Sequence, residues 1–225
     1  MSDRSPRVAI IDFDLGNLFS VAQACRKSGI AAEITNDPKA VAAADALILP
    51  GVGGFPKAME SLKRRGLIAP IQDAAAEGKP IVGICLGMQL LMQSSTEFGE
   101  TPGLGLIEGN VVKLPEIAGP NDRNLPIPNV GWSPVAPVRN GMPWKGTPLA
   151  GTAPGSMFYF VHSFFVQPKR VQDELAATAF GTTTICAAVG RGNIFGMQFH
   201  PERSGAVGLN VYKTIDRITR GKLQA

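Results

Sequence analysis

The sequence predicts an α/β protein with a mainly parallel central sheet, flanking helices and an added antiparallel edge. Three observations lead to this prediction: short apolar runs alternate with helical segments in the first half, β-prone segments without helical periodicity follow, and 44% of the 225 residues are hydrophobic. A chain of this length and composition can bury a sizeable core. We therefore expect residues 1–225 to form a single domain.

The first half alternates between strands and helices. Strands are predicted at short apolar runs, and helices where helical periodicity or good helix formers occur. In chain order, we expect a strand at 7–13, a helix at 18–28, strands at 31–35 and 45–50, a helical region at 55–78 broken near Gly66 and Pro70, a strand at 80–84 and a helix at 88–92. Such alternation indicates parallel strands, whose carboxyl ends are where α/β proteins place their chemistry.

The second half of the chain differs in proline content and in hydrophobic periodicity. Half of the 18 prolines fall within residues 115–154, where helical periodicity disappears. We interpret this region as short strands and loops at the sheet edge rather than as a domain linker. The β-prone segments in or beside it are 110–114, 132–138 and 157–166. Strands at 174–180, 184–189 and 193–199 are expected to form a meander, followed by a helix near 208–219.

Charge and cysteine content narrow the functional classes. The 22 Lys and Arg residues outnumber the 18 Asp and Glu residues by a net +4, but they are scattered, so we expect no nucleic-acid partner. Three cysteines without a close pair, and without histidines at metal-ligand spacing, favour a reduced cytoplasmic setting and predict neither metal nor cofactor. No secretion signal is found, and no apolar run approaches the roughly 20 residues that a membrane helix requires, so we expect no membrane association.

One cysteine stands on a glycine-flanked corner between a strand and a helix. In Gly-Ile-Cys-Leu-Gly at 83–87, the two glycines give a strained turn the room it needs. Cys85 is expected to point away from the sheet, and the start of the helix favours its thiolate form. The next amide, Leu86 N–H, is placed to stabilise an oxyanion. Cys85 is therefore the candidate nucleophile, whereas Cys25 and Cys186 lack a glycine corner and are expected to be inert packing thiols.

A thiolate nucleophile needs a base and a group that orients the base. The chain has two histidines. His200 follows a predicted strand end, and Glu202, two residues on, would lie on the same side of an extended backbone and orient the imidazole toward Cys85. His162 lies on an apolar strand without a carboxylate two residues away, so we expect it to have a structural or substrate-positioning role. The sequence thus predicts a triad of Cys85, His200 and Glu202.

The motifs around this triad resemble those of the class I, or triad, glutamine amidotransferases. The segments 83–89 and 199–202 carry the resemblance, which covers nearly the whole chain. Further segments, similar to the glutaminase subunits of imidazole glycerol phosphate synthases, lie at 50–53, 103–109, 130–132 and 159–163. The resemblance implies a flavodoxin-like fold and hydrolysis of L-glutamine to glutamate and ammonia through a thioester on Cys85.

The resemblance also implies roles for the residues around the nucleophile. Leu86 N–H and a backbone amide of the Gly51-Val52-Gly53 turn would hold the oxyanion, and the glycines would permit a peptide flip between inactive and active geometry. The positions that resemble the glutamine-holding segments are Gln89, His162, Ser163 and Phe164.

A glutaminase needs an acceptor for its ammonia, and 225 residues leave no room for an acceptor domain. The resemblance implies a heterodimer with a (β/α)8-barrel cyclase subunit that forms imidazole glycerol phosphate and aminoimidazole carboxamide ribotide in histidine biosynthesis. The positions that this family places near the subunit interface are Asn17, Trp132, Tyr159 and Arg203. Their structural alternatives are a turn residue, edge-strand packing and a solvated charge.

The chain departs from the family pattern near these positions. Asn129 stands where histidine is usual, Ser133 where asparagine is, Arg203 where lysine is common, and Asp-Phe-Asp at 12–14 replaces Asp-Tyr-Gly. Two alternatives therefore stay open: a paralogue that supplies ammonia for amination of a surface-sugar precursor, and a catalytically decayed subunit that only binds a partner. A stand-alone cysteine hydrolase of the same fold is a third, against which the glutamine-holding segments argue.

Overall fold

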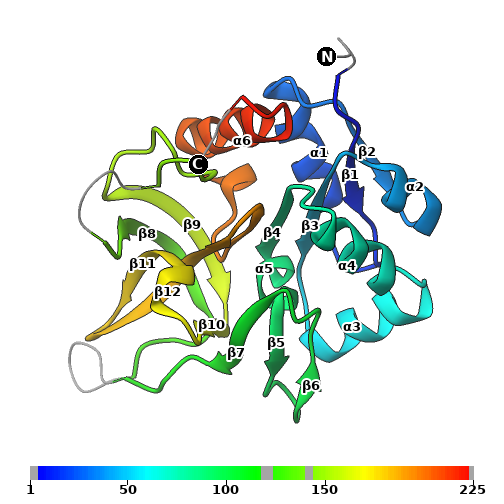
Figure 1. Ribbon diagram of the computed structural model, residues 1–225. Coiled ribbons are helices and arrows are strands. Elements are labelled where there is room, and N and C mark those ends of the chain that lie inside the picture. The colour runs from blue at the N-terminus through cyan, green and yellow to red at the C-terminus, as the bar shows by residue number, and fades with distance from the viewer. Residues whose placement is uncertain (1–4, 118–123, 140–143, 223–225) are drawn as a thin grey trace.

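The computed structural model describes residues 5–117, 124–139 and 144–222. In this part of the chain, a nine-stranded sheet forms the centre of the molecule and a four-stranded sheet lies beside it (Figure 1). No helix in these ranges is long and apolar enough to cross a lipid bilayer.

The large sheet combines a parallel half with an antiparallel half. Its strands in spatial order are β2 (Ala32–Thr35), β1 (Val8–Ile11), β3 (Ala46–Gly51), β4 (Ile81–Cys85), β13 (Ile194–Met197), β12 (Thr183–Arg191), β11 (Glu174–Phe180), β8 (Asn129–Pro137) and β9 (Ser156–His162). Neighbours from β2 to β13 run parallel, and neighbours from β13 to β9 run antiparallel. The predicted α/β fold with a parallel centre and an antiparallel edge is confirmed.

Helices cover both faces of the parallel half (Figure 1). The helices are α1 (Leu18–Lys27), α2 (Pro38–Ala43), α3 (Phe55–Arg64), α4 (Ile68–Ala76), α5 (Leu86–Leu90) and α6 (Gly205–Thr219). Side chains of β1 alternate between two apolar clusters: Val8 and Ile10 lie in the cluster that includes α1 and α6, while Ala9 and Ile11 lie in the cluster that includes α2, α3 and α4. Burial on both faces explains why this strand is a continuous apolar run.

The small sheet was not expected from the sequence. Its order is β10 (Phe164–Pro168), β7 (Ile107–Lys113), β5 (Met92–Ser95) and β6 (Thr101–Pro102). The segment predicted as an edge strand of the main sheet at 110–114 is therefore β7 of a separate sheet. The strand predicted at 157–166 is two strands, because the chain passes from one sheet to the other at Ser163.

Three helix predictions also need correction. The helix expected at 88–92 spans Leu86–Leu90, and Met92 is instead the fully buried first residue of β5, so tertiary packing overrides its helix propensity. Pro70 does not break a helix, because it stands in the first turn of α4, where no N–H is needed. Helix α2 was missed, because six residues are too few to show periodicity; it is capped by Asp37, whose side chain accepts from Lys39 N at 3.0 Å.

Candidate active site

Cys85 ends β4 and immediately precedes α5, and its backbone is strained. Its φ is 54° and its ψ is −110°, a conformation that non-glycine residues rarely adopt. A Cβ at position 87 would lie 1.6 Å from Leu49 O, and one at position 83 would lie 2.6 Å from Gly87 O. The two flanking glycines are therefore required by close backbone approach, and the turn has the geometry of a nucleophile elbow.

The sheet brings His200 and Glu202 to the same end of the strands as Cys85. Strand β13 pairs in parallel with β4, so the segment that follows Met197 emerges beside the segment that follows Ile84. His200 Nδ1 and Glu202 Oε1 lie 2.7 Å apart, and these side chains are 3% and 0% exposed. The backbone between them differs from the extended geometry expected, because Glu202 lies in the 3₁₀ turn η3 (Pro201–Arg203), which still aims its carboxylate at the imidazole.

The environment of His200 favours its charged form. Burial lowers the pKa of an imidazole, but interactions with Cys85 and Glu202 outweigh burial here and raise the pKa of His200 to about 10. Within the described residues, His200 Nε2 has no hydrogen-bond partner that meets ordinary geometric limits, so this nitrogen is free to exchange a proton with a substrate. Burial raises the pKa of Cys25 to about 12 and raises the pKa of Cys186 well above its usual value, so both thiols are held protonated at neutral pH.

The sulfur of Cys85 has two polar neighbours besides the triad. Gln198 Nε2 lies 3.6 Å from Cys85 Sγ, and Val161 O lies 3.8 Å from it. Gln198 was not among the residues that the sequence pointed to. Its position two residues before His200 is the signal that was available, since alternate residues of an extended segment share a side.

The turn expected to supply a second oxyanion donor is closed. Val52 N–H donates to Leu15 O at 3.1 Å, so this amide is engaged by the loop that precedes α1. Leu86 opens α5, and its N–H therefore has no acceptor within the helix. Of the two amides expected to hold an oxyanion, Leu86 N–H is not used by the helix, whereas Val52 N–H is engaged by Leu15 O.

A cavity of about 250 Å³ opens beside Cys85. It brings together residues predicted from distant segments, namely Val52, Gly53, Leu86, Gln89, His162, Ser163 and Phe164. Glu97, Pro128 and Val161 also line it and were not predicted. Glu97 Oε2 accepts from Phe55 N at 2.6 Å, and within the part of the chain that the structure describes its other oxygen makes no hydrogen bond. Nothing local in the sequence marks Glu97, because its place depends on how β5 and β6 pack against α3.

His162 is a neutral, fully bonded side chain rather than a base. Its Nδ1 lies 2.9 Å from Phe164 O, an acceptor, and its Nε2 lies 3.0 Å from Asn129 Nδ2, a donor. These partners require the tautomer with the proton on Nδ1. Burial lowers the pKa of His162 to about 4. Asn129, which departs from the family pattern, thus fills a defined structural position.

The four residues expected near a partner are in two settings. Trp132 and Tyr159 face each other across β8 and β9 with ring centroids 6.0 Å apart, and the Arg203 guanidinium lies 4.8 Å from the Tyr159 centroid. Trp132 is 52% exposed. Asn17 is not part of this surface row; its amide donates to Glu202 Oε1 at 3.2 Å, so it holds the carboxylate that holds His200.

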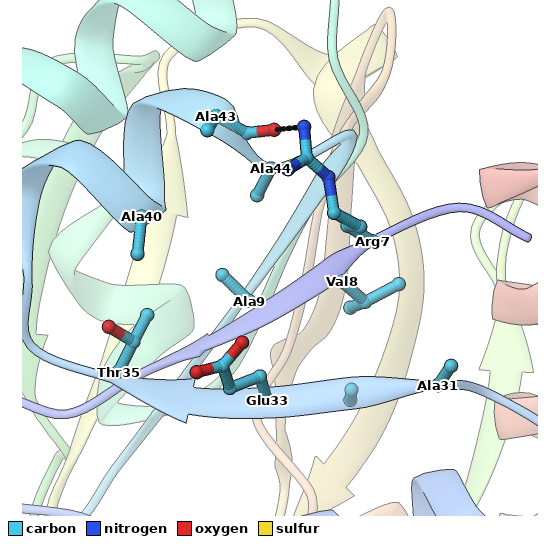
Figure 2. A pocket seen from close by; sticks show the side chains of 10 residues that line it. Arg7, Val8, Ala9, Ala31, Glu33, Thr35, Ala40, Ala43 and Ala44 are labelled. Carbon is cyan, nitrogen blue, oxygen red and sulfur yellow. Dashed lines mark hydrogen bonds between the residues drawn. The ribbon is translucent and has the colours of Figure 1, made fainter.

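A second cavity of about 360 Å³ lies at the β2 edge of the large sheet, between β1, β2 and α2 (Figure 2). Most of its lining is Ala and Val, and the Arg7 guanidinium donates to Ala43 O at 2.7 Å. It contains none of the side chains predicted to carry chemistry. Over the described ranges, no group of three or more His, Cys, Asp or Glu residues is placed to hold a metal ion.

Comparison with known proteins identifies related sequences. The profile of the family described as "Glutamine amidotransferase class-I" matches residues 9–208. A protein named imidazole glycerol phosphate synthase subunit HisH from Symbiobacterium thermophilum is 45% identical over 212 residues, which are 94% of this chain and 94% of that protein. The protein of the same name from Streptococcus sanguinis is 44% identical over 202 residues, which are 90% and 91% of the two chains.

Solved structures share the fold at lower identity. A putative GMP synthase subunit from Thermoplasma acidophilum superposes with a TM-score of 0.69 and 16% identity, covering 98% of this chain and 96% of that one. The structure of PurLQS from Thermotoga maritima gives a TM-score of 0.67 at 21% identity, covering 94% and 98%. These two likenesses concern the fold alone.

Proposed function

The chain belongs to the class-I glutamine amidotransferase family, and we propose that Cys85, His200 and Glu202 are the triad with which it acts as the glutaminase subunit of an imidazole glycerol phosphate synthase in histidine biosynthesis. The observation that carries the site assignment is the meeting of an elbow cysteine with a buried His–Glu pair at the ends of neighbouring strands β4 and β13. We further propose that residues 1–225 act as one domain, because both apolar clusters share the large sheet.

In the first step, the Cys85 thiolate attacks the side-chain carboxamide carbon of L-glutamine. A C–S bond forms, and the carbonyl electron pair moves onto oxygen, where Leu86 N–H stabilises the negative charge. When the intermediate collapses, the C–N bond breaks and protonated His200 gives its Nε2 proton to the leaving nitrogen. The products of this step are ammonia and a thioester on Cys85.

In the second step, water hydrolyses the thioester. Neutral His200 accepts a proton from the attacking water, the C–S bond breaks, and glutamate leaves with regeneration of the thiolate. The new carboxyl group releases its proton to solvent, and the Cys85 thiolate and the His200 imidazolium are both restored. Glu202, bonded to Nδ1 and held by Asn17, stabilises the imidazolium in both steps.

The pocket residues account for recognition of an amino acid. We propose that Glu97 binds the α-ammonium group of glutamine, because it is a carboxylate in the cavity beside Cys85 with an oxygen not used by Phe55 N. The backbone of Ser163 and Phe164, fixed by His162 and Gln89, would contact the same ligand.

The closed turn suggests why such a glutaminase would need a partner. With Val52 N–H bonded to Leu15 O, the oxyanion would have one donor fewer, so we propose that the isolated chain turns over slowly and that docking of a (β/α)8-barrel cyclase opens the turn. The proposed docking face includes Trp132, Tyr159 and Arg203. Tyr159 O accepts from His200 N at 2.8 Å, so this face adjoins the triad.

The deciding experiment measures glutamate release by the isolated chain, and by the chain mixed with the histidine-pathway cyclase and its ribonucleotide ligand. We expect the cyclase and ligand to raise turnover by about two orders of magnitude. A rise only with a barrel protein for surface-sugar amination would support the paralogue instead. Full activity of the isolated chain would contradict gating by Val52, and no release under any condition would support the decayed subunit.

A further inference from the structure

We propose that Gln198 is a positioning residue for the nucleophile: its side-chain amide donates a hydrogen bond to Cys85 Sγ and favours the thiolate. This inference rests on the proposed function, since it concerns the cysteine assigned there. It assigns a role to a residue that neither the triad nor the glutamine pocket includes.

The position of Gln198 suits this role. It follows β13 directly, it is fully buried, and its Nε2 lies 3.6 Å from Cys85 Sγ. Because β13 and β4 are parallel neighbours, both residues are carried to the same end of the same pair of strands. A buried amide without partners is unfavourable, so its placement against sulfur has to be explained by the bonds that it makes.

The orientation of the Gln198 amide follows from a chain of partners. Phe164 O can only accept, so the Gln89 group 2.9 Å from it must be the NH₂ group. The same Gln89 nitrogen lies 3.1 Å from Gln198, and two NH₂ groups would not bond, so Gln198 presents Oε1 to Gln89. The remaining group, Gln198 Nε2, therefore faces Cys85. Each step uses a carbonyl or amide whose role is fixed, and His162 Nδ1–H occupies the other acceptor site of Phe164 O at 2.9 Å.

The two protonation states of Cys85 have different partners in this arrangement. A thiol can donate to Val161 O at 3.8 Å, whereas a thiolate repels that carbonyl and accepts from Gln198. The titratable groups that face Cys85 are His200, from the segment after β13, and His162 and Glu97, from the rim of the cavity. Gln198 therefore adds a neutral donor to a sulfur whose nearest cation is His200.

The test uses two variants with different losses. Gln198→Glu keeps an oxygen that can accept from Gln89 but replaces the donor to sulfur with a negative charge, while Gln198→Met keeps the volume and removes both bonds. We expect the midpoint of the pH profile for iodoacetamide alkylation of Cys85 to rise by about one pH unit in Gln198→Met and further in Gln198→Glu. In the presence of the cyclase, kcat for glutamate release should fall about tenfold, with little change in KM.

Matched controls separate this inference from its alternatives. Met197→Leu, a buried substitution at the last residue of β13, should leave both readouts unchanged, and Cys85→Ala should abolish the alkylation signal. An unchanged alkylation midpoint in folded Gln198→Met protein would overturn the role of Gln198. Because alkylation needs no glutamine, a shifted midpoint in a chain without glutaminase activity would support Gln198 while refuting the proposed function.

Discussion

The two halves of the candidate site, on either side of the cavity beside Cys85, are in different states. On one side, Cys85, His200 and Glu202 are assembled, and Asn17 holds Glu202. On the other side, Val52 is 41% exposed and its N–H is bonded to Leu15 O. Under the proposed function, this difference assigns the necessary movement to the turn at 51–53, while Cys85, His200 and Glu202 need no rearrangement.

Their surroundings explain the difference. The triad sits at the ends of two central strands, where buried side chains and backbone pairing leave one arrangement. The turn lies between β3 and α3, and Val52 at its centre is exposed and bonded to Leu15 in the surface loop at 12–17. That loop is tied to α3, since Asp14, at φ 69°, accepts from Ser61 Oγ and Arg64 Nη2 at 3.1 Å each and pairs with Arg65.

The largest expected effect comes from removing the proposed nucleophile. Cys85→Ala should lower ammonia release at least about 10³-fold, because no nucleophile remains, and should leave cyclase affinity unchanged. The measurements are an ammonia assay and a binding titration. Cys186→Ala is the matched control and should keep its activity. Retained release in Cys85→Ala would show that the site has been placed wrongly.

Low pH should lower the free energy of unfolding, because His162 is buried in its neutral form. Its pKa is about 4 in the folded chain and 6.5 when unfolded, so the unfolded state binds the proton more readily. The contribution to the free energy of unfolding is therefore present above pH 6.5 and is lost as pH falls toward 4, up to about 3 kcal/mol. Denaturant titrations of wild type and His162→Gln should converge over this range. Parallel curves would mean that His162 does not titrate there.

Substitutions in the proposed docking face should lower cyclase affinity without changing glutamate release by the isolated chain. Trp132→Ala removes an exposed aromatic that packs on Tyr159, and we expect cyclase affinity to fall about tenfold. Glutamate release by the isolated chain should stay at its wild-type value. Val171→Ala, which removes a 72% exposed residue of the 3₁₀ turn at Val171–Asp173 and not of the proposed docking face, provides the control. Equal affinity of the two variants for the cyclase would exclude Trp132 from the interface.

The smallest effect should come from weakening the bonds that hold the loop at 12–17 against α3. Asp14→Gly relieves the positive φ and breaks the ties to Arg64 and Arg65, which should raise glutamate release by the isolated chain about fivefold. Asp216→Asn, which breaks the Arg220 pair on α6, tests for a general effect of lost charge. A rate of glutamate release that is unchanged or lower in Asp14→Gly would show that this loop does not hold the turn closed.

Local patterns predicted much of this molecule. The apolar runs predicted the parallel strands. Gly-Ile-Cys-Leu-Gly at 83–87 indicated an elbow, because close backbone contacts at that corner leave no room for a side chain at either glycine. The missed features depend on distant packing. Met92 pairs with Ile107, 15 positions away, and Glu97 and Gln198 come close to Cys85 only after several elements have packed.

The bond that closes the turn joins two main-chain groups, Leu15 O and Val52 N–H. Every residue supplies the carbonyl, and every residue except proline supplies the N–H, so changes of side chain leave both atoms in place. The closed geometry of the turn therefore depends on the path of the backbone and not on the side chains at these two positions. If the turn gates the reaction as proposed, substitutions at either position other than proline at 52 would leave that control in place.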